Sequence, residues 1–240
     1  MPNKGELITK DRIGFEKSNK ALGLLYKEWY ELISKSLSEI DGLNIELGCG
    51  ASFIDQINKS IKKTDVFLNS NTDFKLNAMD IGKDFENKIS NLILVNVFHH
   101  ISDPEIFLKS AEKSLLSGGR IIMIEPSNNY WSRFVYSLVG HEPFDTSQIE
   151  WKFQSKDPLL DSNQALSWII FERDYEKFRD LFPMFTLVQK KNIMPFSYLL
   201  SGGHSFNTRI GKFIKMTRKF ERFFFDKYFG MFNLICLEKI

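Results

Sequence analysis

Cysteine and long hydrophobic runs are scarce in this sequence of 240 residues. The two cysteines, Cys49 and Cys236, lie far apart, which excludes a disulfide framework and a cysteine-based zinc site. No stretch approaches the ~20 consecutive apolar residues of a membrane span. Residues 1–14 are polar and mixed in charge, and they contain no apolar signal core. These absences predict a reduced, cytoplasmic protein.

A large excess of charge of one sign is also lacking. The chain has 32 lysines and arginines against 30 aspartates and glutamates, for a net charge of +2. Proteins that bind nucleic acids usually carry a broad basic excess, so we expect no nucleic-acid partner. A chain of this length buries roughly 70% of its unfolded surface, so its core needs no disulfide or metal cross-links.

Aromatic residues, in contrast, are plentiful and unevenly distributed. Of the 34 phenylalanines, tyrosines and tryptophans, 24 follow residue 120. This asymmetry predicts two halves with different tasks.

Short apolar runs alternate with helical patterns along most of the chain. Apolar residues at three- and four-residue steps predict a helix over residues 18–40, ended by Asp41 and Gly42. The expected strands are residues 43–47, 64–68, 74–78, 92–98, 120–124, 185–194 and 231–239. Further helices are expected at residues 53–61, 103–117, 128–139, 174–181 and 210–229. This order favours an α/β fold with a parallel sheet covered on both faces.

A glycine-containing loop, ELGCGAS, follows the first expected strand at residues 46–52. Glycines at such a turn let the backbone approach a ligand closely. The third glycine of a dinucleotide fingerprint would fall on Phe53, whose ring argues against a pyrophosphate at that position. The phosphate loop of ATP- and GTP-binding proteins is absent as well.

Acidic side chains near this loop suggest a different ligand. Glu46 can receive an ammonium group or order the water around it. Asp65 ends the second expected strand, where a carboxylate can accept both hydroxyls of a ribose. S-adenosylmethionine combines a ribose with a cationic amino-acid end and has no phosphate, so we expect it as the cofactor.

Five segments in register resemble the class I S-adenosylmethionine-dependent methyltransferases, and in particular a bacterial branch similar to the type 11 enzymes. The segments are ELGCGAS, TDV, NAMD, LVNVFHHISDP and LLSGGRIIMIEP, within residues 43–126. The resemblance implies a doubly wound, Rossmann-like sheet of seven strands whose last strand is antiparallel. The expected strands at residues 185–194 and 231–239 fit the final hairpin of that sheet. Ser52 replaces the third glycine of the family loop.

The resemblance also implies roles for individual residues. The glycine loop would hold the methionine end of the cofactor, and Asp65 would hold the ribose. The adenine contact falls on Asn77 or Asp80, and we favour Asn77 with Ala78 and Met79. The expected cofactor-binding residues are Glu46, Gly48, Cys49, Gly50, Asp65, Asn77, Ala78, Met79, Asn96 and Val97.

Histidines supply the candidate catalytic groups. His99 and His100 follow the fourth strand at the edge where such sheets bind ligands, and one of them can reach the site. We expect His100 to act as a general base for an acceptor hydroxyl or carboxylic acid. The alternative is that it only holds the loop before Asp103 in place. His141, beside Glu142, is the second candidate, and His204 is a weaker one. No metal site is expected, since no two histidines share helical ligand spacing with an acid.

The expected organisation is an N-terminal helical cap, residues 1–42, on a methyltransferase domain, residues 43–240. Residues 126–185 and 196–230 would form the substrate pocket and its lid, for a small-molecule, glycan or lipid-intermediate acceptor. Residues 210–229 form a basic amphipathic stretch that is either a lid or a helix contacting a membrane surface.

Two other functions remain open. The first is a non-catalytic regulatory protein that binds an adenosyl ligand on the same fold, because fold does not fix activity. The second is a nicotinamide-dependent oxidoreductase, which Phe53 disfavours.

Overall fold

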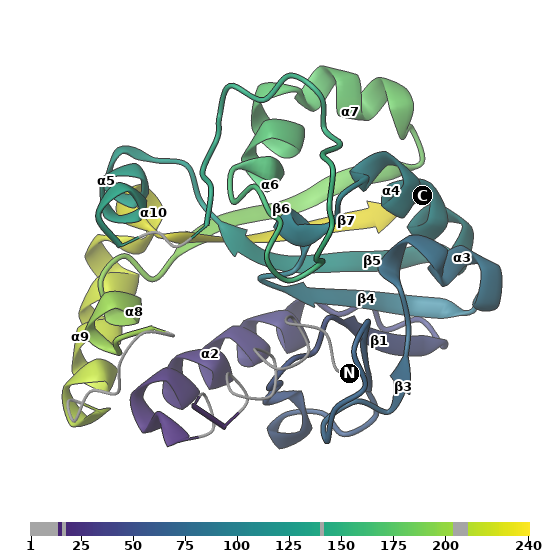
Figure 1. Cartoon of the computed structure of the whole chain (residues 1–240). Helices are drawn as coiled ribbons and strands as arrows, with labels where there is room; N and C mark the ends of the chain where they lie inside the picture. Colours follow the sequence, from purple (N-terminus) through teal and green to yellow (C-terminus); the bar gives the residue numbers. More distant parts are fainter. Residues whose placement is uncertain (1–13, 16–17, 140–141, 204–210) are drawn as a thin grey trace.

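A computed structural model describes residues 14–15, 18–139, 142–203 and 211–240 (Figure 1). Seven strands form one sheet in the order β3-β2-β1-β4-β5-β7-β6. Their bounds are β1 Leu43–Leu47, β2 Lys62–Asp65, β3 Phe74–Lys75, β4 Ile89–Val95, β5 Leu115–Pro126, β6 Phe185–Ile193 and β7 Phe232–Lys239. Only β7 runs antiparallel to its neighbours β5 and β6. The predicted fold class, a doubly wound sheet with an antiparallel last strand, is confirmed.

Helices and helical turns connect the strands. The α-helices are α2 Lys20–Ser36, α3 Ile81–Asp84, α4 Pro104–Ser114, α5 Tyr130–Val139, α6 Leu166–Trp168, α7 Tyr175–Leu181, α8 Ser197–Leu200, α9 Gly211–Phe224 and α10 Asp226–Phe229. Shorter turns are η1 Ile54–Gln56, η2 Ala78–Asp80, η3 Phe98–His100 and the π-helical η4 Ile169–Arg173. No described helix is long and apolar enough to cross a membrane.

Local sequence explains where α4 begins. The side chain of Asp103 accepts a hydrogen bond from the backbone N–H of Ile106 at 3.0 Å. Pro104 follows at the first helical position, where its missing N–H costs nothing.

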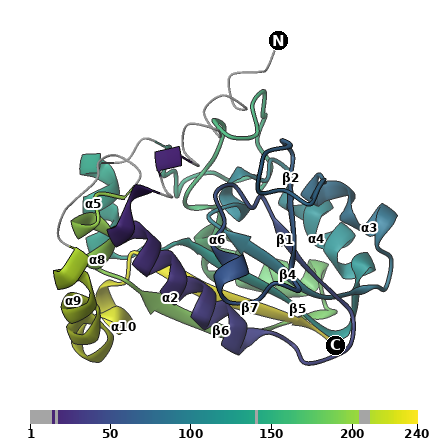
Figure 2. The ribbon, with the colours of Figure 1, turned by 90° about the horizontal axis from the view of Figure 1, so that it is seen from below.

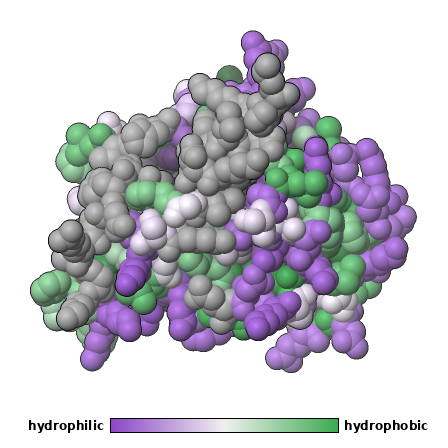
Figure 3. Space-filling model, turned by 60° about the horizontal axis from the view of Figure 1, so that its bottom comes forward, coloured by the Kyte–Doolittle hydropathy of each residue, from purple (hydrophilic) through white to green (hydrophobic). Residues whose placement is uncertain are grey.

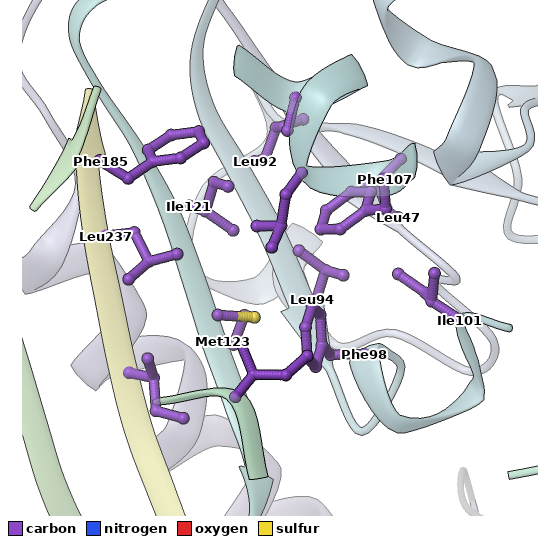
Figure 4. Close-up of a cluster of buried hydrophobic side chains, with 14 of the residues drawn as sticks. Leu47, Leu92, Leu94, Phe98, Ile101, Phe107, Ile121, Met123, Phe185 and Leu237 are labelled. Carbon is purple, nitrogen blue, oxygen red and sulfur yellow. The ribbon is translucent and has the colours of Figure 1, made fainter. Parts of the chain in front are cut away.

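The sheet is buried on both faces because its central strands carry apolar side chains that point to both sides. Leu92 and Leu94 of β4 contribute to one core cluster, while Ile93 between them contributes to the other. Figure 4 shows Leu92, Leu94 and Met123 grouped with Phe107 of α4 on the first side. Helix α2 covers the opposite face, as the view from below shows (Figure 2). Continuous apolar strands of this kind are typical of parallel sheets between two helical layers.

Several sequence predictions need correction. The strands expected at 64–68 and 74–78 are shorter in the structure, β2 Lys62–Asp65 and β3 Phe74–Lys75. The helix expected at 53–61 is wrong, because only the short turn η1 forms there. Asn58 accepts hydrogen bonds from the backbone N–H and hydroxyl of Ser60, and such local bonds compete with a helix. The strand expected at 92–98 begins earlier, at Ile89, and ends at Val95, because Asn96 adopts a positive φ of 54°.

Candidate functional site

A cavity of about 670 Å³ lies at the carboxyl ends of β1, β2 and β4. The strand order reverses between β1 and β4, and doubly wound sheets bind ligands at such a switch point. A volume of this size suits a small-molecule ligand. All ten residues expected to bind the cofactor line the cavity, and so does His100.

The glycine loop is shaped by backbone geometry that few other residues accept. Gly48 and Gly50 have φ values of +63° and +48°. A Cβ atom on Gly48 would lie 2.7 Å from a methyl carbon of Val97, so a side chain would not fit there. The backbone N–H of Cys49 donates to the carbonyl of Thr64 at 2.9 Å, which ties the loop to β2. The loop therefore presents bare backbone to the cavity.

Glu46 lies at the floor of this loop and is almost completely buried. The hydroxyl of Tyr30, from α2, donates to its carboxylate at 2.5 Å, and the hydroxyl of Ser52 donates at 2.6 Å. Burial raises the pKa of Glu46 to about 7, although both hydrogen bonds oppose the shift. The carboxylate is therefore poised to change its protonation near neutral pH.

Asp65 ends β2 with its carboxylate already oriented. It accepts hydrogen bonds from the backbone N–H of Gly50 and of Phe67, both at 3.1 Å. Burial raises the pKa of Asp65, while these backbone hydrogen bonds act in the opposite direction. A carboxylate has about four acceptor positions, so two bonds leave it able to accept hydroxyl donors from the cavity.

The residues after β3 form the turn η2 at the edge of the cavity. The side chain of Asn77 accepts from the backbone N–H of Met79 at 3.0 Å and caps this turn. Asp80, the alternative adenine contact, does not line the cavity and instead pairs with Lys83. Of the two positions that the sequence left open, Asn77 is the one that faces the cavity.

Asn96 follows β4 in the left-handed region that asparagine tolerates better than most residues. Its backbone N–H donates to Ile124 at 2.8 Å. Its side-chain oxygen is buried and has no hydrogen-bond partner among the described residues, although Asn96 lines the cavity. A buried acceptor of this kind needs an explanation, and a donor group on a bound ligand supplies one.

His99 lies between two carboxylates that come from different parts of the chain. Its Nδ1 is 2.6 Å from Glu125 of β5, and its Nε2 is 3.2 Å from Glu142. The other oxygen of Glu125 accepts from the backbone N–H groups of Val97 and Phe98. The carboxylate of Glu125 thus holds the turn after β4 through the side chain of His99 and two backbone N–H groups.

The charges in this cluster support one another. Burial alone would lower the pKa of His99, but Glu125 and Glu142 raise it to about 10. Burial alone would raise the pKa of Glu142, but His99 and His100 hold it well below its usual range. The cluster therefore consists of an imidazolium between carboxylates at neutral pH, with His100 Nε2 3.8 Å from Glu142.

The same residues have the spacing of a metal-ligand set. Ligand atoms of His99, His100 and Glu142 lie within 4.8 Å of one another. The sequence offered no metal signal, because a helical turn and a distant loop bring these side chains together. Both ring nitrogens of His99 already contact carboxylates, so the hydrogen bonds account for the arrangement.

A further, mainly apolar part of the cavity wall comes from the second half of the chain. Its residues include Pro126, Tyr136, Leu159, Tyr198, Leu199, Met231 and Phe232. Gln164 adds a polar group, since its amide donates to Glu142 at 3.3 Å. Gly202 and Gly203, which follow α8, complete this side.

Some functional candidates were predicted and others were not. Tyr30 and Glu125 carried no signal in the sequence, because their partners lie 16 and 26 residues away along the chain. His141 and His204, both sequence candidates, fall outside the described residues.

Comparisons with known proteins agree on the fold. No protein-family model matches the sequence, and no curated protein matches it. Geranyl diphosphate C-methyltransferase from Streptomyces coelicolor A3(2), solved with S-adenosyl-L-homocysteine, is 13% identical with a TM-score of 0.54, covering 91% of this chain and 80% of its own. A SAM-dependent methyltransferase from Archaeoglobus fulgidus is 11% identical with a TM-score of 0.55, covering 90% and 94%. The chain therefore has the fold of the class I S-adenosylmethionine-dependent methyltransferases.

Proposed function

We propose that this protein binds S-adenosylmethionine in the cavity and transfers its methyl group to a small acceptor. The observation that carries the proposal is the convergence of all ten sequence-predicted cofactor residues on one cavity. They come from four separate segments at the carboxyl ends of β1, β2, β3 and β4, so their meeting is not a local effect. The shared fold with enzymes that bind this cofactor or its product adds support.

Each part of the cofactor has a suitable partner among these residues. Asp65, held by two backbone N–H groups, would accept the ribose hydroxyls. The carboxylate of Glu46 and the unpartnered oxygen of Asn96 would receive the ammonium group, directly or through water. Asn77, Ala78 and Met79 would border the adenine.

The sulfonium of the cofactor already activates the methyl group, so the protein mainly has to position the two reactants. With the cofactor bound, an acceptor oxygen would form a bond to the methyl carbon while the bond from that carbon to sulfur breaks. The proton of an acceptor hydroxyl would pass to a ring nitrogen of His100. Glu142, 3.8 Å from His100 and carrying a negative charge, would stabilise the imidazolium that forms.

The cavity wall favours an acceptor with an apolar body. Tyr136, Tyr198 and Phe232 bring aromatic side chains to the part of the cavity wall that comes from the second half of the chain. A glycan would need many polar partners there, whereas Gln164, His100 and Glu142 provide one polar corner. Among the acceptor classes expected from the sequence, an apolar small molecule or a lipid intermediate fits this wall best.

Replacing Asp65 by alanine tests the cofactor assignment. Loss of a charged acceptor for two hydroxyls should weaken the affinity for S-adenosylhomocysteine by about 1–3 kcal/mol. Isothermal titration calorimetry measures this change, and Asp73→Ala is a matched control because Asp73 does not line the cavity. An unchanged affinity in Asp65→Ala would remove the ribose assignment.

A non-catalytic adenosyl-binding protein would give a different pattern. It would bind the cofactor with the same dependence on Asp65, but it would form no S-adenosylhomocysteine with any acceptor. Product formation from S-adenosylmethionine across a panel of apolar alcohols and acids separates the two functions.

A further inference from the structure

Helices α9 and α10 expose an unusual set of side chains. Between residues 213 and 229, every exposed side chain is aromatic, methionine or cationic. The largest apolar exposures belong to Phe223 at 81%, Met216 at 66% and Tyr228 at 64%. The exposed cations are Lys215, Lys219, Arg222 and Lys227.

The acids of this segment face inward. Glu221 and Asp226 are buried, and both contact the guanidinium of Arg218, with Asp226 Oδ1 at 2.9 Å. Glu28 of α2 reaches the same guanidinium at 2.7 Å. The arrangement removes the acids of residues 213–229 from the outer surface. Of the exposed cations, Arg222 also pairs with Glu28 at 2.8 Å, whereas Lys215, Lys219 and Lys227 have no exposed acid within residues 213–229.

Helix α5 extends this surface although it lies far away in the sequence. Tyr130, Phe134 and Leu138 are exposed by 91%, 56% and 68%, and Arg133 beside them is exposed as well. Figure 1 shows α5 beside α10, the two helices are in contact, and Figure 2 places both at the same end of the molecule. Figure 3 shows hydrophobic and hydrophilic atoms side by side at that edge. We call the exposed side chains of α5 and of residues 213–229 the aromatic face.

Packed rings join the two parts of the aromatic face into one unit. Trp131 of α5 meets Phe196 with ring centroids 5.1 Å apart, and Phe196 meets Phe225 at 5.6 Å. Because these packed rings lie beneath both parts, the exposed side chains form one continuous surface.

The exposed rings of the aromatic face do not belong to the cavity. None of the described side chains of residues 213–229 lines it. The inner side of the same region does line it, through Tyr136 of α5 and Tyr198 and Leu199 of α8. The aromatic face is therefore a second surface, on the outside of the elements that form the acceptor wall.

We propose that the aromatic face docks on the surface of an anionic lipid bilayer. Aromatic side chains favour the boundary between headgroups and acyl chains, and lysine and arginine are attracted to anionic headgroups. Self-association through this face would bring its cations against those of the second copy, which opposes a dimer there. Docking depends on the exposed side chains alone and does not depend on the proposed methyl transfer.

Co-sedimentation with large vesicles tests the proposal with the full chain. Vesicles of phosphatidylcholine with 30% phosphatidylserine should sediment the protein at low salt, and pure phosphatidylcholine vesicles should sediment at least tenfold less. The double variant Phe220→Ser/Phe223→Ser and the variant Lys219→Glu/Lys227→Glu should each lower the partition coefficient at least tenfold. Ile149→Ser is the matched control, since Ile149 is 83% exposed and lies outside the aromatic face.

Absence of binding to the anionic vesicles at low salt would overturn the proposal. Equal binding by the wild type and both face variants would do so as well. A dimer seen by light scattering, lost in Phe220→Ser/Phe223→Ser without any vesicle binding, would assign the face to a second copy instead. Affinity for S-adenosylhomocysteine, measured on the same variants, should stay unchanged and keeps this test separate from the proposed function.

Discussion

Glu46 illustrates how one buried carboxylate links helix α2 to the glycine loop. The hydroxyls of Tyr30 and Ser52 both donate hydrogen bonds to its carboxylate. These bonds partly offset the free-energy cost of burying its charge. Because its pKa is about 7, about half of the molecules carry this charge at pH 7. A bound ammonium group would favour the ionised form, so binding and ionisation of Glu46 are coupled.

The affinity for S-adenosylhomocysteine should therefore depend on pH through Glu46. Between pH 7.5 and pH 6.0 the ionised fraction of Glu46 falls, and the affinity should weaken by roughly five- to tenfold. Calorimetry at the two pH values measures the effect. Glu46→Gln should bind weakly at both pH values with a flat profile, and the same slope in that variant would contradict the role of Glu46.

His99 is the second residue whose protonation matters, in this case for stability. Its folded pKa of about 10 lies above the ordinary value of 6.5, so the folded state holds this proton more tightly than the unfolded chain. The resulting stabilisation is complete below about pH 6.5 and is lost as the pH rises toward 10. The free energy of unfolding should decrease over that range.

Replacing His99 by glutamine tests this contribution. The change leaves Glu125 buried without its charged partner, which should lower the free energy of unfolding by about 3–5 kcal/mol at pH 7. Urea denaturation measures the loss, with His100→Gln as the neighbouring control. A stability profile between pH 7 and pH 10 that is as steep in His99→Gln as in the wild type would contradict the assignment.

At the level of helices and strands, the sequence predicted most of the elements that position the site. The glycine loop after β1 and the histidines after β4 lie where apolar runs meet polar residues, and such boundaries are visible in the sequence. The wrong helix at 53–61 and the early end of β4 have a common cause, since Asn58 and Asn96 adopt local conformations that apolar periodicity does not reveal.

The contact between α2 and α9 depends on Arg218, which the sequence presented only as one more cation. Its guanidinium, 4% exposed, contacts Glu28, Glu221 and Asp226. Arg218→Met would leave these carboxylates buried without a cation. We expect a loss of about 3–5 kcal/mol in the free energy of unfolding.

Lys219→Met is the matched control for Arg218→Met, because Lys219 is the next residue and is exposed. Surface changes of this kind usually alter stability by no more than about 0.5 kcal/mol. Urea denaturation of both variants provides the comparison. A similar small change in the two would mean that the ion cluster contributes little to holding α9 against α2.

At the scale of the whole molecule, the unequal distribution of aromatic residues acquires a structural meaning. The residues proposed to bind the cofactor all lie before residue 100, whereas the apolar wall from Pro126 to Phe232 belongs to the aromatic-rich half. The division between the halves could be predicted from composition. The wall itself could not be predicted from composition, because Tyr136, Tyr198 and Phe232 come together only when the chain folds with this order of strands. The aromatic face, too, needs the fold to bring α5 beside α10.

Ligand-induced stabilisation tests the whole cavity at once. A ligand present at 100 times its dissociation constant stabilises the folded state by about 2.7 kcal/mol. For a chain of this size that corresponds to a rise in Tm of about 5–10 °C. S-adenosylmethionine and S-adenosylhomocysteine should both produce such a rise in a thermal-shift experiment, and Asp65→Ala should reduce it. NAD⁺ and NADH should produce none, because Phe53 follows the glycine loop where a pyrophosphate-binding turn needs glycine. A rise with NADH and none with the adenosyl ligands would favour the oxidoreductase alternative instead.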